Sequence, residues 1–131
     1  YHPGRVVLAR PMYTAASEEQ ARRDTHDPFM WFKRTGNEVG APPDHDTDLL
    51  PEEFSAYRRR FARDVSFDYD AAFDNVALFG TPDQVAGRIE SLRDGGVENL
   101  IFFINYGGID TRKVMASLEM FAKEVMPRFA D

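Results

Sequence analysis

The hydrophobic pattern is clearest in the last third of the chain, from Asn75 to Phe129. It predicts a strand over residues 76–79, a helix that ends at Gly95-Gly96, a second strand over residues 100–104 and a long helix from about residue 110. Two consecutive strand–helix units predict a parallel sheet that is covered by helices. The segments upstream have to fit this α/β architecture.

The helices of this region have recognisable signals. Thr81 is the expected N-cap of the first helix, Pro82 takes the first helical position, and Gln84 completes a capping box. In the last helix, which Pro127 is expected to stop, apolar residues recur at helical spacing. Its buried stripe is expected to contain Val114, Leu118, Phe121 and Val125, widened by Met115, Ala122 and Met126.

The strands differ in their apolar patterns. Leu100 to Ile104 is a continuous apolar run, which is typical of a strand buried on both faces. Near the N-terminus, residues 5–10 contain β-branched residues and predict another strand. Pro11 indicates an edge position or a strand end, because proline has no N–H to donate to a neighbouring strand. Residues 12–14 continue the extended path.

Between these strands the sequence predicts two helical pieces. Ser17 to Gln20 form a capping box, and the helix extends to about His26. Asp27-Pro28 predicts a stop and a restart. Four large apolar residues, Phe29 to Phe32, form the second piece, which Gly36 closes. We expect this run to be buried on more than one side, with a partner chain as a candidate cover.

The middle of the chain is the least regular part. Residues 36–50 contain two Pro and several acidic residues and predict a long surface loop. A helix is expected over residues 51–63, with Phe54, Tyr57 and Phe61 on one face. The Asp-rich segment from Phe67 to Phe73 predicts a short helix or a turn. We treat residues 1–131 as a single α/β unit that contains the 36–50 loop.

Composition narrows the class of protein. The chain has 131 residues, of which 43% are hydrophobic and 13% aromatic, so it can build a core of one domain or less. The lack of cysteine excludes disulfides and Cys-ligated zinc. A net charge of −6 makes nucleic acid and anionic membranes poor partners. The run Arg58 to Arg60 is better explained as the polar face of an amphipathic helix. Without an apolar span or a leader pattern, we expect a cytoplasmic protein.

Four segments together resemble a known family. They are Gly80-Thr81-Pro82-Asp83-Gln84-Val85, Gly95-Gly96-Val97-Glu98-Asn99-Leu100, Asn105-Tyr106-Gly107-Gly108 and Glu124-Val125-Met126-Pro127-Arg128-Phe129. In this order and spacing they resemble the C-terminal end of the luciferase-like flavin-dependent monooxygenases, the bacterial luciferase-like family. The earlier run Glu18 to Asp24, followed by Trp31-Phe32, is similar to the segment that precedes this end in the family.

This resemblance implies a fold and a chemistry. Members of the family are (β/α)8 barrels that use reduced FMN or the related deazaflavin coenzyme to oxidise small organic substrates. A whole barrel takes about 250 residues, so this chain resembles only the C-terminal portion, about three parallel strands with covering helices. The early and middle strands supply much of the flavin site, which implies that this chain alone binds no flavin or binds it incompletely. Its open strand edges and apolar face predict a homo-oligomer, or association with the missing barrel portion.

The resemblance also places the chemistry at the C-terminal ends of the strands. There, Asn105 can donate or accept hydrogen bonds, Tyr106 offers a ring and a hydroxyl, and the two glycines let backbone approach a ligand. The alternative is that the glycines only make the turn into the next helix. Similarly, the N-terminus of the helix that begins after Thr81 can hold an anion through its free N–H groups, or Thr81 can serve only as the cap of that helix. The candidate pocket residues for substrate or cofactor are Met12, Tyr13, Gly80, Thr81, Asn105, Tyr106, Gly107 and Gly108.

No metal site is predicted, because Asp44-His45-Asp46 lies beside two prolines in a segment typical of a solvated loop, and flavin oxygenases need no metal. The functional hypothesis is part of a luciferase-like flavin-dependent monooxygenase whose strand-end loops contact a small-molecule substrate. The alternative is a non-catalytic interaction module or subunit that dimerises through its apolar strand face. Flavin binding would favour the first, and a stable dimer without flavin the second.

Overall fold

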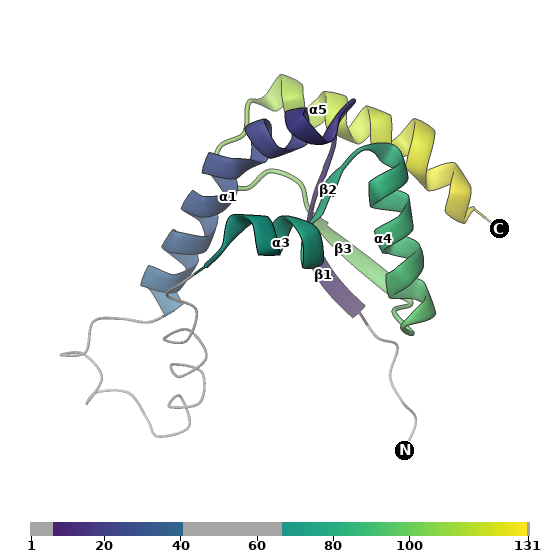
Figure 1. Ribbon diagram of the computed structural model, residues 1–131, viewed down its shortest axis with the longest axis horizontal. Helices are drawn as coiled ribbons and strands as arrows, with labels where there is room; N and C mark the ends of the chain where they lie inside the picture. Colours follow the sequence, from purple (N-terminus) through teal and green to yellow (C-terminus); the bar gives the residue numbers. More distant parts are fainter. Residues whose placement is uncertain (1–6, 41–66, 131) are drawn as a thin grey trace, which may run out of the picture.

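The computed structural model describes residues 7–40 and 67–130 (Figure 1). The predictions for the 41–50 part of the loop, the helix at 51–63, Asp44-His45-Asp46 and Arg58 to Arg60 lie outside these residues. The elements in chain order are β1 (Val7–Thr14), α1 (Glu18–Gly40), α3 (Tyr69–Asn75), β2 (Leu78–Gly80), α4 (Pro82–Asp94), β3 (Asn99–Phe103) and α5 (Thr111–Met120), which continues as a π-helical turn (Phe121–Val125) and a 3-10 turn (Met126–Phe129).

The three strands form one parallel sheet in the order β2-β1-β3, so the predicted parallel α/β sheet is confirmed. The first half of β1 pairs with β3, from Val7 opposite Asn99 to Pro11 opposite Phe103. The second half pairs with β2, from Met12 opposite Leu78 onwards. The hydrophobic pattern gives no strand order, and the central position of β1 comes from the structure alone.

Pro11 lies inside this central strand, so the expectation of an edge position or a strand end is wrong. The N–H of Ala15 donates to the carbonyl of Gly80 on β2 at 2.9 Å. Because alternate residues of a strand face alternate neighbours, the ring nitrogen of Pro11 also faces the β2 side. Pairing with β2 begins only at Met12. The missing N–H therefore falls where no partner strand needs it.

Helices cover both faces of the sheet (Figure 1). Tyr13 and Phe79 point towards α1 and α3, while their neighbours Met12 and Leu78 point towards α4 and the C-terminal helix. The α1-side core contains Tyr13, Ala15, Ala21, Phe29, Tyr69, Ala72, Phe73, Ala77, Phe79, Tyr106, Ile109 and Val114. The α4-side core contains Met12, Leu78, Val85, Ala86, Ile89, Phe121 and Val125.

The strand β3 is not buried on both faces, which corrects the interpretation of its continuous apolar run. Leu100 and Phe102 are half-buried against the α4-side core. The alternate side chains Ile101 and Phe103 are 54% and 45% exposed. They lie on the other face, where α1 and α3 pack mainly over β1 and β2. An apolar strand at the edge of the sheet is thus left with one open face.

The helix α1 runs without a break from Glu18 to Gly40, so the expected stop at Asp27-Pro28 and the end at Gly36 are wrong. The predicted cap is confirmed, since the N–H of Gln20 donates to Ser17 Oγ at 3.1 Å. A proline inside a helix removes one hydrogen bond to the carbonyl four residues earlier. Packing of the next residue, Phe29, compensates for this loss.

Phe29 is 3% exposed, and its ring contacts Phe79 and Tyr106 edge-on, with centroids 5.3 and 5.7 Å apart. The rest of its apolar run is only partly covered. Trp31 is 54% exposed and Phe32 is 38% exposed, so the expected burial on more than one side holds for Phe29 alone. Successive helical residues point about 100° apart, so Trp31 is turned towards solvent, while Met30 packs against the core and Phe32 reaches the Tyr106 ring.

Most helix signals near the C-terminus are confirmed. Thr81 caps α4 with the full capping box, and the helix ends before Gly95-Gly96. The side chain of Asp110 caps α5. The stripe from Val114 to Val125 packs into the cores as predicted. Met115 and Met126 are more than half exposed and do not widen it. Pro127 does not stop the helical path, which continues to Phe129 in a 3-10 turn.

Candidate functional site

The C-terminal ends of the three parallel strands lie at the same end of the sheet, and α5 runs across this end beside the start of α1 (Figure 1). The backbone N–H of Thr14, at the end of β1, donates to Ser117 Oγ of α5 at 2.7 Å. Ser117 is itself buried. A helix side chain therefore takes the hydrogen bond that a neighbouring strand would accept at this position.

A cleft of about 360 Å³ opens between the end of β1, the first turn of α1 and the first half of α5. We call it the α5 cleft. Its walls combine charged and polar groups with a few apolar side chains, so the cleft offers both hydrogen bonds and apolar contacts to a ligand. The lining residues are Tyr13, Thr14, Ala15, Gln20, Asp110, Arg112, Lys113, Ala116, Ser117 and Met120.

A buried carboxylate lies behind this cleft. Asp24 of α1 has a side chain that is 3% exposed, and it accepts hydrogen bonds from the Tyr13 hydroxyl at 3.0 Å and from Lys113 Nζ at 2.6 Å. Burial works to raise the pKa of Asp24, but the bonds from Lys113 and Tyr13 outweigh it and hold the pKa below its ordinary value. Asp24 is therefore an anion at neutral pH, and it fixes the ammonium group of Lys113 at the cleft.

Tyr13 is a donor and not a base. Burial and the neighbouring Asp24 carboxylate raise the pKa of its hydroxyl well above the ordinary value of 10.0. The phenol is thus neutral over the physiological range. The half-exposed Lys113 side chain is the charged group of this triad that solvent or a ligand can reach.

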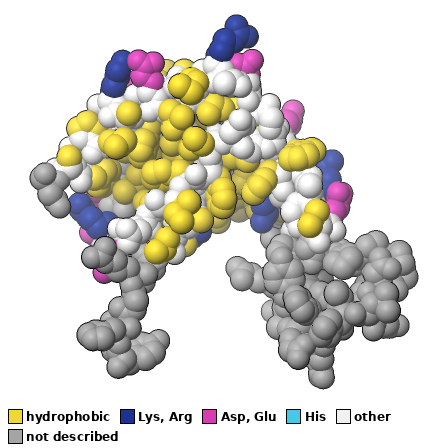
Figure 2. All heavy atoms as spheres, turned by 180° about the vertical axis from the view of Figure 1, so that it is seen from behind, with side chains coloured by type: hydrophobic (Ala, Val, Ile, Leu, Met, Phe, Trp, Pro, Cys, Tyr) yellow, Lys and Arg dark blue, Asp and Glu magenta, His cyan; other side chains and the backbone are white. Residues whose placement is uncertain are grey.

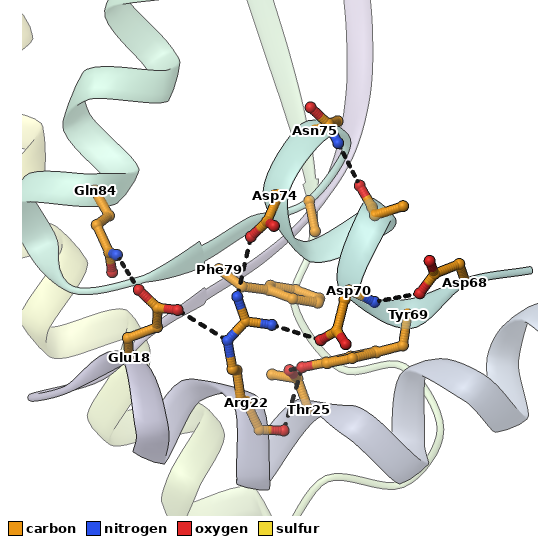
Figure 3. Close-up of polar contacts among 12 residues, drawn as sticks. Glu18, Arg22, Thr25, Asp68, Tyr69, Asp70, Asp74, Asn75, Phe79 and Gln84 are labelled. Carbon is orange, nitrogen blue, oxygen red and sulfur yellow. Dashed lines mark hydrogen bonds and ion pairs between the residues drawn. The ribbon is translucent and has the colours of Figure 1, made fainter.

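The loops after β1 and β2 are joined by one side chain. Gln84 Oε1 accepts the N–H of Thr81 at 2.9 Å, and Gln84 Nε2 donates to Glu18 Oε2 at 2.5 Å (Figure 3). Gly80 has φ +139, and a Cβ there would lie 2.4 Å from Gln84 Oε1. The cap thus occupies the N–H groups of Thr81 and Gln84, so a ligand at this end would have to use other atoms.

Arg22 extends this connection to α3 (Figure 3). Its guanidinium binds Glu18, Asp70 and Asp74 at 2.9, 2.8 and 3.0 Å. The guanidinium also lies 3.9 Å above the Phe73 ring. Each exposed ion pair contributes little by itself, but together they fix the start of α1 against α3. The start of α1 is one wall of the α5 cleft.

Tyr106 lies in the α1-side core. It is 4% exposed, and its ring stacks on Phe79 with centroids 5.7 Å apart and an interplanar angle of 23°. Its hydroxyl has no hydrogen-bond partner within residues 7–40 and 67–130. Burial raises its pKa far above the ordinary value, so the phenol stays neutral.

The residues around Tyr106 form the turn from β3 into α5. Gly107 has φ +63, and a Cβ there would lie 1.9 Å from the carbonyl oxygen of Pro28. Asn105 and Gly108 are exposed. The turn thus requires glycine for a close approach to α1, and it does not extend into the α5 cleft.

The eight residues predicted from the strand ends are therefore dispersed. Tyr13 lines the α5 cleft, Met12 lies on the opposite face of the sheet, and the others surround the ends of β2 and β3. Their part in a pocket stays a prediction. Sequence reasoning missed Asp24, Lys113 and Ser117, which lie on the helices that follow β1 and β3. The available signal was their position within the first two turns of those helices.

Two further surface features lie outside the cleft. An apolar groove of about 690 Å³ runs along the α4-side face, and Figure 2 shows hydrophobic side chains gathered over one broad face of the molecule. Within the described ranges, no group of three or more His, Cys, Asp or Glu residues is arranged to hold a metal. In residues 7–40 and 67–130, no helix has the length and apolar character to cross a membrane. The groove is lined by Met12, Ile89, Leu100, Phe102, Leu118, Phe121, Ala122, Met126, Phe129 and Ala130.

The model of the luciferase-like monooxygenase family matches residues 2–99 of the chain. The chain belongs to this family. A search of curated proteins finds no matching relative for this luciferase-like chain. The matched range contains β1, β2 and the helices between them, so the resemblance noted in the sequence is confirmed.

Two solved structures are similar to this chain in fold. Monooxygenase RslO1 from Streptomyces bottropensis is 20% identical, with a TM-score of 0.61 over 99% of this chain. The oxygenating constituent of 3,6-diketocamphane monooxygenase from the CAM plasmid of Pseudomonas putida, a type II Baeyer-Villiger monooxygenase in complex with FMN, is 23% identical, with a TM-score of 0.59 over 93%. This luciferase-like chain spans 33% of each of these proteins, which confirms a partial barrel.

Proposed function

We propose that this chain is the C-terminal part of a flavin-dependent monooxygenase and forms the substrate-side wall of its site. The observation that carries this proposal is the α5 cleft, which lies at the carboxyl end of the central strand β1. In barrel enzymes, loops at the carboxyl ends of the strands build the active site. The family match and the two monooxygenase neighbours support the reaction class.

The cofactor that we propose is FMN, with the deazaflavin coenzyme as the alternative. When bound, a flavin supplies the redox chemistry, and the protein supplies orientation and shielding. The α5 cleft has donors that could bind polar atoms along one side of a flavin, because Lys113 is a fixed cation and Ser117 has a neutral hydroxyl. Among the described residues that line the cleft, Tyr13 is the aromatic one, and it is buried, so none of them presents an exposed ring on which a flavin could stack. A complete flavin site therefore needs walls from the missing barrel portion or from a second copy.

The residues of this chain would then have distinct roles. Lys113 faces the cleft and stabilises negative charge on a substrate oxygen. Asp24 acts as a positioning residue, because its two hydrogen bonds hold Lys113 and Tyr13 in place. Gln84 positions the loop after β2 against α1 through Glu18.

The test is a titration of reduced FMN under anaerobic conditions, read by flavin fluorescence, with light scattering on the same samples. We expect binding only at protein concentrations at which the chain associates, with micromolar affinity, about −8 kcal/mol. The variant Lys113→Gln should weaken it, while Lys123→Gln, on the exposed side of the C-terminal helix, should not. An associated chain that quenches no flavin at any concentration would refute the proposal.

A second candidate function, an interaction module, is favoured by the open face of β1 and β3. Val7 and Ile101 are each 54% exposed and Phe103 is 45% exposed. Unpaired strand edges with apolar faces are common association sites. We expect a homo-oligomer that Ile101→Lys dissociates in sedimentation velocity, whereas Met115→Lys, at a site on α5 that is 60% exposed, leaves it intact. A wild-type chain that remains monomeric at high micromolar concentration would exclude this function.

A further inference from the structure

The charges of the α5 cleft are arranged in an uneven way. Two cations, Arg112 and Lys113, line the cleft, and Asp110 is the one acidic residue among its lining groups. The second carboxylate, Asp24, lies behind the wall with a side chain only 3% exposed. The charged groups that a ligand meets at the surface are therefore two cations and one carboxylate, while the buried Asp24 carboxylate offsets part of the charge of Lys113 from behind.

These cations keep donors that their present contacts do not use. Lys113 has three N–H donors and gives one to Asp24, while its side chain is 52% exposed. Arg112 contacts Asp110 through Nε at 3.4 Å, with a side chain that is 93% exposed. Its two terminal nitrogens thus remain available. The hydroxyl of Ser117 accepts from Thr14, which leaves its own hydrogen to donate.

The remaining walls are apolar. Ala15, Ala116 and Met120 complete the lining, so a ligand would bring an apolar body as well as an anionic group. A volume of about 360 Å³ suits a small molecule. We propose that the α5 cleft binds the carboxylate of a small organic acid, with Lys113 and Ser117 as donors and Arg112 as an attracting charge at the rim.

This inference rests on the proposed function, because it names the substrate class of the same site. Its test needs no flavin. Benzoate and its neutral isostere benzamide are titrated into the chain at low salt, and binding is followed by chemical shifts in ¹H–¹⁵N NMR spectra. We expect benzoate to shift the amides of Thr14, Arg112 and Ser117, and benzamide to bind at least tenfold more weakly. Added salt should weaken benzoate binding.

Two variants and a control identify the donors. Lys113→Gln should weaken benzoate binding about tenfold, in line with the loss of one charge-assisted hydrogen bond. Because that variant leaves Asp24 with one partner fewer and can affect folding, Arg112→Gln provides an exposed second test, with a loss of several-fold. Arg128→Gln removes the same charge at the far end of the C-terminal helix and should change the affinity less than twofold.

The outcomes separate this inference from the proposed function. Equal affinity for benzoate and benzamide, or equal effects of Arg112→Gln and Arg128→Gln, would overturn it. If benzoate binds as described while reduced FMN does not bind at all, the carboxylate site stands and the flavin proposal falls. If FMN binds and benzoate does not, only the carboxylate site is lost.

Discussion

Replacement of Asp24 by asparagine tests the buried triad most directly. The amide keeps nearly the same shape but removes the charge and offers one acceptor oxygen where the carboxylate accepts from both Tyr13 and Lys113. A hydrogen bond to a charged group contributes about 1.5–3 kcal/mol when buried. Because the Lys113 side chain is half exposed, solvent replaces part of that bond. We therefore expect a loss of about 2 kcal/mol at pH 7.

The loss should depend on pH in a defined direction. The folded pKa of Asp24 lies below its ordinary value of 3.8, so the carboxylate contributes stability above that value and loses it as the pH falls through the folded pKa. The charged or titratable groups that face it are Tyr13 from β1, Lys113 from α5 and Arg23 from α1. The difference between wild type and variant should therefore shrink below about pH 4.

The assay is urea unfolding of both proteins, followed by far-UV circular dichroism, at several pH values between 3 and 8. Other carboxylates titrate in the same range, but they are common to both proteins and cancel in the difference. A difference below about 0.5 kcal/mol at pH 7 would show that Asp24 is not charged and paired as described. A difference that stays constant down to pH 3 would refute the linkage argument.

Three further predictions concern the packing of β3 and of the turn that follows it. Gly107→Ala should lower the free energy of unfolding by more than about 2 kcal/mol, because its Cβ would meet a backbone carbonyl of α1 at 1.9 Å. Gly108→Ala is also at positive φ but has open space around it, so it should cost about 1–2 kcal/mol. Equal losses in thermal unfolding would contradict the contact at Gly107. Tyr106→Phe should be neutral or stabilising, since it removes a buried hydroxyl without a partner among the described residues and keeps the stacked ring; a loss above about 1 kcal/mol in urea unfolding would reveal a partner. In the cysteine-free chain, the double variant Ala9→Cys, Ile101→Cys should form an intramolecular disulfide on oxidation, because these residues are paired across β1 and β3. Each single variant is the control. Reactive thiols that fail to cross-link on non-reducing gels would disprove the strand order.

Local signals in the sequence predicted the local structure well. The caps at Ser17 and Thr81 depend on a few neighbouring residues, and both form as the pattern indicates. The parallel sheet followed from the succession of strands and helices. The local rule that proline ends a helix fails at Pro28, where the burial of Phe29 in an aromatic core decides the outcome.

The candidate site was harder to predict because it depends on strand order. The apolar run of β3 predicted burial on both faces, but a strand at the edge of this sheet has one face covered. The same order brings α5 against the end of β1, and this contact places Lys113 beside Asp24, far apart in the sequence. Spacing along the chain contains no information about such a pair.

The central position of β1 also affects how this chain can fold. β1 precedes both of its partner strands in the sequence, and Val7 pairs with Asn99 across most of the chain. Such distant pairings close large loops before any contact compensates for the lost chain entropy, which slows folding. During synthesis β1 would emerge before both of its partner strands, and its first half would stay unpaired until β3 had been made. The apolar residues of that half are therefore open to wrong association for longer than those of β2.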